Sequence, residues 1–428
     1  MGGYISNTEA DRREMLDFLG IASVGELFKG IPESVRLKKE LDLPAALSEM
    51  EVMDELSNLA SKNLTQYPSF LGAGSYSHFI PSVVKHICSR SEFYTAYTPY
   101  QAEASQGTLQ SIFEYQSMIC SLTGMDVANA SMYDGATAMA EAALLACSVT
   151  KRDEIVVSKT VHPAYREVLK TYATGADKKV IEIAFGESTI SPNAACVIVQ
   201  QPDFFGCIVN LDGIAGKLRQ NGTLFIVGVN PISLGILKPP EADIIVGEGQ
   251  PLGNPQNFGG PGLGIFAVKE KYLRNIPGRL VGKTVDKDGK EAYCLTLQTR
   301  EQHIRREKAG SNICSNEALC ALAAAVYLSS LGAKGLKKVA ESCYEKAHYL
   351  ADKLKDRVLF KKALFFNEFA IKVDRPVSEV NQKLLENGII GGLDLGKFYS
   401  TLKNHMLVAV TETTKKEDMD KFVEIVSA

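Results

Sequence analysis

The sequence predicts a doubly wound α/β domain with a largely parallel sheet, together with a small C-terminal α+β domain and a helical N-terminal arm. Through the middle of the chain, short runs of β-branched residues alternate with helical segments. These runs are apolar almost throughout, which is typical of strands that helices cover on both faces. Near residue 310 the composition shifts to alanine-rich helices. We therefore expect an arm at residues 1–66, a large domain at 67–310 and a small domain at 311–428.

The arm is expected to be helical but to have little core of its own. Asn7 or Thr8 can cap a first helix, which the break at Gly20 should end. A further helix is predicted from Leu43 to Asn58, where apolar residues recur at helical spacing. Short helices of this kind bury little surface among themselves, so the arm should cover the main domain or a partner.

Seven short runs supply the expected strands, five in the large domain and two in the small one. The strands are predicted at 154–158, 180–183, 195–200, 223–228 and 243–246, and then at 366–373 and 405–410. The predicted helices include 106–122, 136–147, 315–331, 335–354 and a final amphipathic helix from about residue 415. Strands and helices that alternate in this way indicate a doubly wound sheet.

The composition is that of an ordinary globular enzyme. A net charge of −3 over 428 residues gives no reason to expect binding to nucleic acid or a membrane surface. No apolar run is long enough to span a bilayer, and the polar, acidic start does not resemble a targeting segment. The nine cysteines form no C-x-x-C pair and the six histidines are dispersed. We therefore expect reduced thiols, a cytoplasmic location and no metal site.

A missing lysine is the most informative feature of the large domain. Residues 242–250 and 257–267 form an apolar strand, a polar turn and a glycine-rich second strand. This element looks like the one that carries the Schiff-base lysine in pyridoxal-phosphate enzymes of aminotransferase-like fold (type I). That chemistry needs an amine that can lose its proton. No lysine lies between Lys238 and Lys269, and the nearest counterpart is Gln250, whose amide cannot form an aldimine.

A second expected group is also missing. In the same fold, the strand at residues 225–230 carries an aspartate that pairs with the protonated pyridine nitrogen of the cofactor. Here Val227 stands at that position, and its apolar side chain cannot form the pair. The loss of both groups indicates an architecture kept without its own catalytic centre.

Two turns carry donors of the kind that bind phosphate. Asp134, Gly135 and Ala136 lead into a predicted helix, and the free amides of a helix N-terminus can hold a phosphate. Ser311 and Asn312 lie in a Gly-Ser-Asn turn that exposes amide and hydroxyl donors. Each turn can equally be an ordinary helix start.

Two polar residues follow predicted strands at the edge where open α/β sheets bind ligands. His162 could stack on a cofactor pyridine, although it could also be only a polar loop residue before a proline. Asp203 could equally belong to a simple Pro-Asp turn. The predicted vestigial cofactor pocket therefore consists of Asp134, Gly135, Ala136, His162, Asp203 and Gln250.

The segment from Thr95 to Gln110 is unusually rich in hydroxyl and amide groups for a connection. Tyr94, Tyr97 and Tyr100 recur at every third position, and Pro99 stiffens the turn. Tyrosine combines a rigid body with a polar tip, which suits a binding surface. The same side chains could instead pack beneath the loop with their hydroxyl groups satisfied locally.

Four runs carry a specific family resemblance: residues 71–78, 94–101, 247–254 and 300–307. They resemble subunit 1 of glycine dehydrogenase (decarboxylating), the N-terminal half of the glycine cleavage system P-protein. The resemblance extends from the arm to the last helix. It also agrees with Gln250 and Val227, because subunit 1 of this family lacks the cofactor lysine.

The resemblance implies a share in glycine catabolism. The P-protein decarboxylates glycine on pyridoxal phosphate and passes the aminomethyl group to the lipoyl arm of H-protein. Subunit 2 is expected to hold the cofactor in an α2β2 assembly, with none bound covalently by this chain. Active sites of this fold lie between subunits, so this chain would contribute residues to its partner: Tyr94, Tyr97, Thr98, Tyr100, Gln101, Ser311 and Asn312.

Two alternatives remain open at this point. The chain could be an independent pyridoxal-phosphate enzyme that uses Lys238 or Lys269 as its nucleophile, although neither lies in the expected turn. It could also be a pseudo-enzyme that only stabilises or regulates subunit 2.

Overall fold

The protein is described here from a computed structural model, in which residues 7–184, 186, 190–313 and 317–428 are described. The chain divides into two compact units, residues 1–65 and 66–428. The predicted helix start at residue 315 lies outside the described residues.

The N-terminal unit contains α1 (Glu9–Leu19), the 3₁₀ helix η1 (Val24–Phe28) and α2 (Glu49–Ala60). Thr8 caps α1 as predicted: its hydroxyl accepts from the Asp11 amide, and the Asp11 carboxylate accepts from the Thr8 amide. Gly20 ends α1 with φ +67°. The predicted start of the next helix at Leu43 is wrong, because the capping box of Ser48 and Glu51 sets the start of α2.

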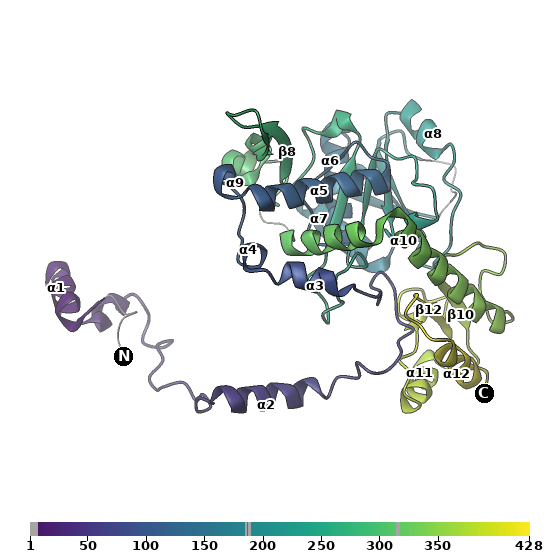
Figure 1. The fold of residues 1–428 in the computed structure, drawn as a ribbon, viewed down its shortest axis with the longest axis horizontal. Coiled ribbons are helices and arrows are strands. Elements are labelled where there is room, and N and C mark those ends of the chain that lie inside the picture. The colour runs from purple at the N-terminus through teal and green to yellow at the C-terminus, as the bar shows by residue number, and fades with distance from the viewer. Residues whose placement is uncertain (1–6, 185, 187–189, 314–316) are drawn as a thin grey trace. The chain divides into compact units, whose positions relative to one another are not determined.

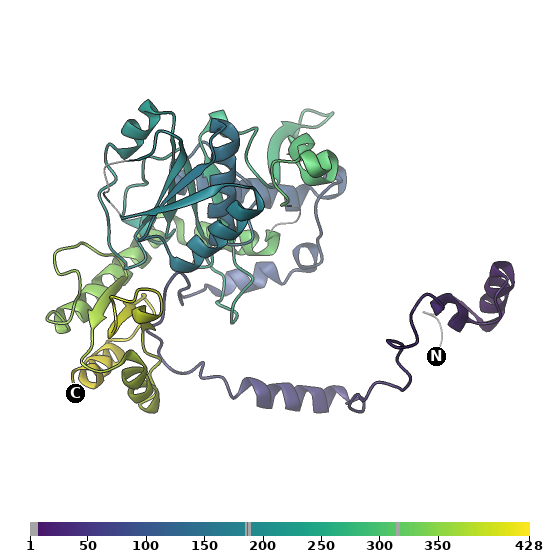
Figure 2. The ribbon, with the colours of Figure 1, turned by 180° about the vertical axis from the view of Figure 1, so that it is seen from behind.

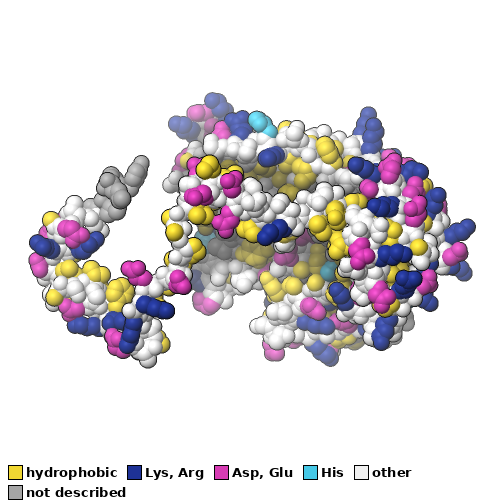
Figure 3. Space-filling model, turned by 90° about the horizontal axis from the view of Figure 1, so that it is seen from below, with side chains coloured by type: hydrophobic (Ala, Val, Ile, Leu, Met, Phe, Trp, Pro, Cys, Tyr) yellow, Lys and Arg dark blue, Asp and Glu magenta, His cyan; other side chains and the backbone are white. Residues whose placement is uncertain are grey.

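Apolar side chains of this unit lie at its surface. No residue of α1 or α2 is buried within the described structure. Phe18 is 90% exposed, and Leu43, Met50 and Met53 are each more than half exposed. Figure 3 shows such apolar side chains on the surface of the unit. Amphipathic helices of this kind are covered only when they pack on another surface.

The second unit is built on a seven-stranded sheet in the order β1-β7-β6-β5-β4-β2-β3. Its strands are β1 (Val127–Ala128), β2 (Glu154–Ser158), β3 (Lys179–Ile183), β4 (Ala194–Gln201), β5 (Leu224–Val229), β6 (Ile244–Glu248) and β7 (Gly264–Val268). Strands β2 to β6 are parallel, whereas β7 pairs antiparallel with both β6 and β1. The predicted doubly wound, largely parallel sheet is confirmed.

Helices cover both faces of this sheet, as the views from the front and from behind show (Figures 1 and 2). Alternate residues of β5 serve the two faces: Phe225 and Val227 pack in one core cluster, and Ile226 packs in the other. The first cluster includes residues of α5 (Gln106–Thr123), α8 (Ile214–Gln220) and α10 (Ala318–Lys353), and the second those of α6 (Gly135–Thr150) and α7 (Pro163–Gly175). Burial on both faces explains why the strands read as continuous apolar runs.

The C-terminal residues form a small antiparallel sheet in the order β10-β12-β11. Its strands are β10 (Glu368–Lys372), β11 (Leu393–Asp394) and β12 (His405–Ala409), and α11 (Val377–Glu386) and α12 (Lys416–Ser427) pack nearby. The hairpin of β8 (Leu280–Val285) and β9 (Glu291–Thr296) was not predicted. Short segments complete the unit: α3 (Ser82–Cys88), α4 (Ser91–Tyr94), η2 (Ala102–Ala104), η3 (Ser233–Gly235), η4 (Glu270–Tyr272), η5 (Gln298–Arg300), α9 (Gln302–Arg305), η6 (Arg306–Lys308) and η7 (Leu395–Lys397).

Helix α10 contains the break that the sequence predicted between two helices. Gly332 has non-helical torsion angles (φ 59°, ψ −179°) inside the 36-residue element. By length and composition alone, α10 also resembles a membrane-spanning helix, but core helices meet the same criteria. Its N-terminal half packs Ala321, Ala324 and Tyr327 into the core of the large sheet. Packing in the core therefore accounts for these apolar residues of α10.

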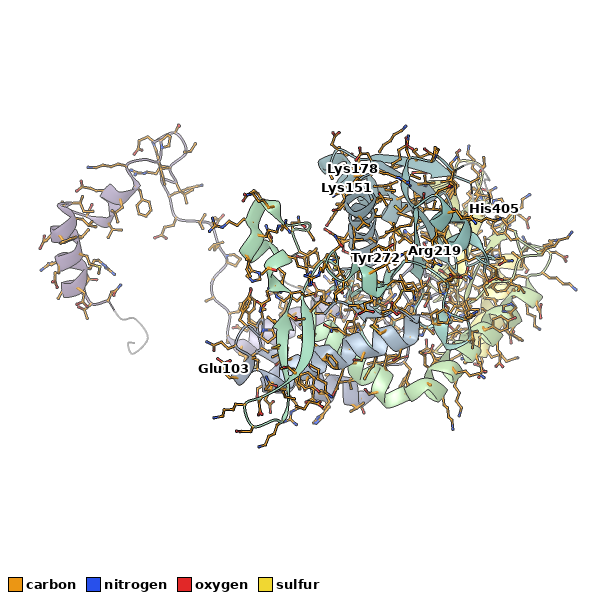
Figure 4. The ribbon with its side chains drawn as sticks, turned by 90° about the horizontal axis from the view of Figure 1, so that it is seen from above. Glu103, Lys151, Lys178, Arg219, Tyr272 and His405 are labelled. Atoms are coloured by element: carbon orange, nitrogen blue, oxygen red, sulfur yellow. The ribbon has the colours of Figure 1, made fainter. Side chains whose placement is uncertain are left out.

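Asp243 anchors the amino end of β6. Its buried carboxylate accepts from the Phe225 amide at 3.1 Å and from the Tyr272 hydroxyl at 3.3 Å. Lys271 and Arg219 approach it at 3.2 and 3.9 Å; Tyr272 and Arg219 are labelled in Figure 4. These contacts fix the amino end of β6.

Candidate functional site

A cavity opens at the carboxyl ends of β4, β5 and β6, the edge at which doubly wound sheets bind ligands. It is lined by Gly74, Tyr76, Tyr165, Gln200, Gly228, Val229, Asn230, Pro231, Gly247, Glu248 and Pro251. Three of the six residues predicted for the cofactor pocket form hydrogen bonds with residues that line this cavity: Gly135 and Gln250 with Glu248, and His162 with Gln200. None of the six is among the lining residues.

Gln250, at the predicted lysine position, ties two backbone segments together. Its amide nitrogen donates to the carbonyls of Tyr76 and Asn254 at 3.0 and 2.7 Å, and its amide oxygen accepts from the Tyr76 amide at 3.0 Å. The side chain is buried. A lysine could not accept the bond from Tyr76, because an ammonium group has no acceptor. The position therefore performs a structural task that requires an amide.

Glu248 lies two residues earlier and faces the start of α6. Its carboxylate accepts hydrogen bonds from the amides of Gly135, Gln250 and Leu263 at 2.9, 2.9 and 2.8 Å. Burial raises the pKa of this carboxyl to about 6, although the three amides lower it. The predicted phosphate turn, formed by Asp134, Gly135 and Ala136, therefore has a carboxylate of the same chain against it. Sequence reasoning missed Glu248.

His162 forms hydrogen bonds to the first turn of its own helix and to the segment at Ala73 beside the cavity. Its Nδ1 accepts from the Ala164 amide at 3.1 Å, so Nε2 carries the proton and donates to the Ala73 carbonyl at 2.9 Å. Burial lowers the pKa of the ring, which favours the neutral form. The ring centroid lies 5.1 Å from that of Tyr165 and 4.8 Å from that of Phe204. Both ring nitrogens are therefore engaged, and side chains already pack around the ring.

Asp203 and Val227 also have local partners. The Asp203 carboxylate accepts from the amides of Phe205 and Cys207, each at 2.9 Å, and burial raises its pKa to about 7. This is the turn that the alternative interpretation predicted. Val227 is fully buried in the sheet core, paired with Val199 and Ile245 on the neighbouring strands. It offers no carboxylate to a pyridine nitrogen.

The residues present do not fit pyridoxal phosphate as a resident cofactor. The position predicted for the amine holds the bonded amide of Gln250, and the position predicted for the ring partner holds Val227. Glu248 places a carboxylate where the phosphate would need donors.

A buried carboxylate on β10 closes the cavity wall from the C-terminal domain. Glu368 accepts from the Tyr76 hydroxyl at 2.5 Å and from the Ala73 amide at 2.6 Å. Burial raises the pKa of Glu368 to about 7, and it also raises the pKa of Tyr76. The partners are 292 and 295 residues apart in sequence, so no local pattern could reveal the contact.

We expect this carboxyl to make stability fall as the pH rises. In the unfolded chain Glu368 titrates near its ordinary value of 4.5, whereas in the folded chain it keeps its proton up to about pH 7. Its stabilising contribution is thus complete below pH 4.5 and is lost as the pH rises to about 7. Glu368→Gln removes this titration. Between pH 4.5 and 7, the unfolding free energy of the wild type should therefore fall more steeply with pH than that of Glu368→Gln, by about 1.4 kcal/mol per pH unit. Urea unfolding at several pH values measures both slopes, and parallel slopes would contradict the assignment.

The tyrosine segment, residues 94–101, begins with the last residue of α4 and ends before η2. Tyr94 and Tyr97 are 69% and 75% exposed. Tyr100 is about half exposed; its hydroxyl accepts from the buried Arg279 at 3.0 Å, and the guanidinium lies 5.5 Å from its ring centroid. Tyr94 and Tyr97 are therefore exposed, whereas Tyr100 is bonded to the buried Arg279. Of the remaining predicted residues, Thr98 is half-buried and Gln101 is exposed.

The second predicted segment reaches the same neighbourhood. Asn312 is exposed, and the hydroxyl of the half-buried Ser311 accepts from the Ile313 amide at 3.1 Å. The Ile313 side chain lies 3.7 Å from the place where a side chain on Gly278 would begin. Gly278 precedes Arg279, which holds Tyr100. Both segments therefore meet at residues 278–279.

The fold also gathers three potential metal ligands that the sequence separates widely. His78 Nδ1 and Cys343 Sγ lie 2.7 and 3.3 Å from Glu412 Oε2, and the Phe79 amide donates to Glu412 Oε1 at 2.7 Å. Each oxygen of the carboxylate thus has a partner in the chain itself. The group joins residues 78–79 to the C-terminal domain by hydrogen bonds.

Comparison with known proteins shows the family. A family model described as glycine cleavage system P-protein matches residues 2–426. A probable glycine dehydrogenase (decarboxylating) subunit 1 from Geobacillus kaustophilus is 55% identical and aligns with 98% of this chain and 97% of its own length. Its counterpart from Listeria monocytogenes is 52% identical, with 98% and 97% covered.

Solved structures agree with this result. A crystal structure of glycine decarboxylase (P-protein) of the glycine cleavage system, in inhibitor-bound form, has a TM-score of 0.89 and 43% identity and covers 99% of both chains. Glutamate decarboxylase of Lactobacillus brevis matches at a TM-score of 0.64 and 13% identity over 94% of this chain and 96% of its own, which supports the fold alone. The predicted type I fold of pyridoxal-phosphate enzymes is confirmed. The chain belongs to the glycine cleavage system P-protein family, and the relatives that it matches along almost their whole length carry the name of subunit 1.

Proposed function

We propose that this chain is the lysine-free subunit of a glycine decarboxylase and that it completes the active site of a homologous subunit 2. The observation that carries the proposal is the contrast between its two surfaces. Beside the cavity at the sheet edge, the Gln250 amide is already bonded to the backbone of the chain itself. Tyr94 and Tyr97, by comparison, present their side chains outward. Pyridoxal phosphate would then be bound by subunit 2.

The reaction of the assembled enzyme would be the decarboxylation of glycine, followed by transfer of the aminomethyl group to the lipoyl arm of H-protein. Within it, Tyr94, Tyr97, Thr98, Tyr100, Gln101, Ser311 and Asn312 would supply hydroxyl and amide groups to the partner's pocket. Rigid aromatic side chains with polar tips can orient a small substrate and exclude water from it. We also propose an α2β2 assembly located in the cytoplasm.

The positions of the two candidate lysines argue against an independent enzyme. Lys269 donates through its backbone to the Asp243 carbonyl and through Nζ to the Gly124 carbonyl at 3.1 Å. Pro239, the neighbour of Lys238, packs near Gly124. Asp243 precedes β6, so both lysines lie at the amino end of that strand, and the cavity lies at its carboxyl end. A five-residue strand separates the two edges by about 17 Å.

A purely supporting role is the second candidate. The observation that favours it is the N-terminal unit, whose apolar side chains, such as Phe18 and Met50, are exposed. An arm of this kind can stabilise a partner without touching its chemistry. In the proposed role the exposed tyrosines contribute to the active site of subunit 2, whereas in a purely supporting role they do not.

Replacement of Tyr97 separates these roles. Because Tyr97 is 75% exposed, Tyr97→Ala should leave the stability of the chain and its assembly with subunit 2 unchanged. The glycine decarboxylation rate of the complex should fall at least about tenfold if the side chain positions the substrate. The assay is release of carbon dioxide from carboxyl-labelled glycine, with assembly followed by gel filtration. Tyr97→Phe then reports the share of the hydroxyl group.

Leu364→Ala is a suitable control. Leu364 is a large side chain, 66% exposed, in the segment before β10 and outside the tyrosine segment. We expect full activity from this variant. Full activity from Tyr97→Ala as well would favour the supporting role and remove Tyr97 from the proposed site.

A further inference from the structure

We propose that the Glu248 carboxylate is a built-in replacement for a cofactor phosphate, which occupies the anion position at the N-terminus of α6 and so excludes phosphorylated ligands from this pocket. The inference concerns this chain alone. It does not depend on how the chain serves a partner.

The first argument is the geometry of the donors around Glu248. Three backbone amides from separate segments converge on one carboxylate: Gly135 at the start of α6, Gln250 after β6 and Leu263 before β7. Converging amides at a helix N-terminus are the donors that proteins use for phosphate. A carboxylate oxygen satisfies the same donors, with the charge sign that the helix dipole favours.

The second argument is that the remaining donors of the helix start are already used or lie beside negative charge. Asp134 caps α6: its carboxylate accepts from the Thr137 amide at 2.8 Å, and the Thr137 hydroxyl accepts from the Asp134 amide at 3.2 Å. An incoming phosphate would therefore meet the carboxylates of both Asp134 and Glu248. The negative charges of a phosphate and of these carboxylates repel one another, and more strongly in a buried site than in water.

The third argument is space. A side chain on Gly135 would meet the Glu248 amide at 2.8 Å and would also overlap the Tyr165 hydroxyl. A side chain on Gly262 would begin 3.2 Å from Glu248 Oε2. Glycine at both positions lets the turn after β6 approach the helix start closely enough for the carboxylate to enter. The anion position at the start of α6 is thus occupied by a side chain of the chain itself, without a cofactor.

The test is phosphate binding by the purified full-length chain and its Glu248→Ala variant. Alanine opens the position and leaves the Gly135, Gln250 and Leu263 amides without their acceptor. We expect inorganic phosphate to raise the melting temperature of the variant saturably, and to bind it at least about tenfold more tightly than the wild type. Sodium chloride at equal ionic strength provides the reference. Isothermal titration with inorganic phosphate measures both affinities.

Two control variants test whether a gain in phosphate affinity comes from removal of the Glu248 carboxylate or from a general loosening of the structure. Glu248→Asp keeps the anion, so it should gain no phosphate affinity. Glu141→Ala removes a different buried carboxylate, on α6 six residues after Gly135, and should gain none either. A gain in either control would overturn the proposal, as would equal phosphate binding by wild type and Glu248→Ala.

An alanine variant that does not fold in phosphate-free buffer still gives an answer. The refolding yield then becomes the measurement. The proposal expects phosphate, but not chloride, to restore the yield, and equal yields overturn it. The proposed function would survive that failure, because the contribution of Tyr97 to the partner is measured by decarboxylation in the assembled enzyme.

Discussion

Purified by itself and supplied with glycine and pyridoxal phosphate, this chain will release no carbon dioxide above the rate of the free cofactor. The reason is the absence of an amine at the pocket: Gln250 is held by three hydrogen bonds and can form no Schiff base. Addition of subunit 2 should restore turnover. Because enzymes accelerate such reactions by at least about a million-fold, the two conditions should differ by orders of magnitude.

Subunit 2 alone is the necessary control, and it should be less active than the mixture. Turnover by this chain alone, in proportion to its concentration, would contradict the proposal and support an independent enzyme. In that case Lys238→Ala and Lys269→Ala would identify the nucleophile. Their position at the amino end of β6 makes us expect no effect from either change.

The substitution Gly206→Ala should lower the stability of the chain far more than Gly213→Ala does. Gly206 has φ +82°, and a side chain there would overlap the carbonyl oxygen of Glu368 and lie 2.5 Å from its carbonyl carbon. The Gly206 carbonyl also accepts from the Phe366 amide at 3.1 Å. Since backbone cannot move aside as a flexible side chain does, we expect a loss of at least about 3 kcal/mol.

Gly213→Ala is the matched control for this prediction. Gly213 also has a positive φ, +75°, but a side chain there would meet no atom within 4 Å. It should therefore cost only the conformational penalty, about 1 kcal/mol. Urea unfolding gives both values. Equal losses would show that the backbone at Glu368 moves aside at little cost, which would contradict the prediction.

The fold was predictable where burial imposes a simple pattern. Strand β2 (Glu154–Ser158) has the predicted bounds because it is an apolar run in a sheet covered on both faces. The hairpin of β8 and β9 escaped because its outer part is exposed and carries charged residues such as Lys283 and Glu291. Such strands resemble polar loops. In the arm, the capping box of Ser48 and Glu51 set the helix start more precisely than apolar spacing did.

The candidate site was predictable only as a set of absences. A sequence can show that Gln250 and Val227 stand at the positions predicted for a lysine and an aspartate, because type and position are local information. It cannot show what fills the space, because the donors are distant: the Glu248 carboxylate meets an amide 113 residues away. The Glu368 carboxylate meets one 295 residues away. Such contacts follow only from the three-dimensional fold.

The most direct test of the central claim is to locate the cofactor in the assembled enzyme. This chain and subunit 2 are mixed with pyridoxal phosphate and reduced with borohydride, and peptides are then mapped by mass spectrometry for a pyridoxyl-lysine. The proposal predicts a label on subunit 2 alone and an unlabelled Lys238 and Lys269 in this chain. A stoichiometric label on any lysine of this chain would contradict the account.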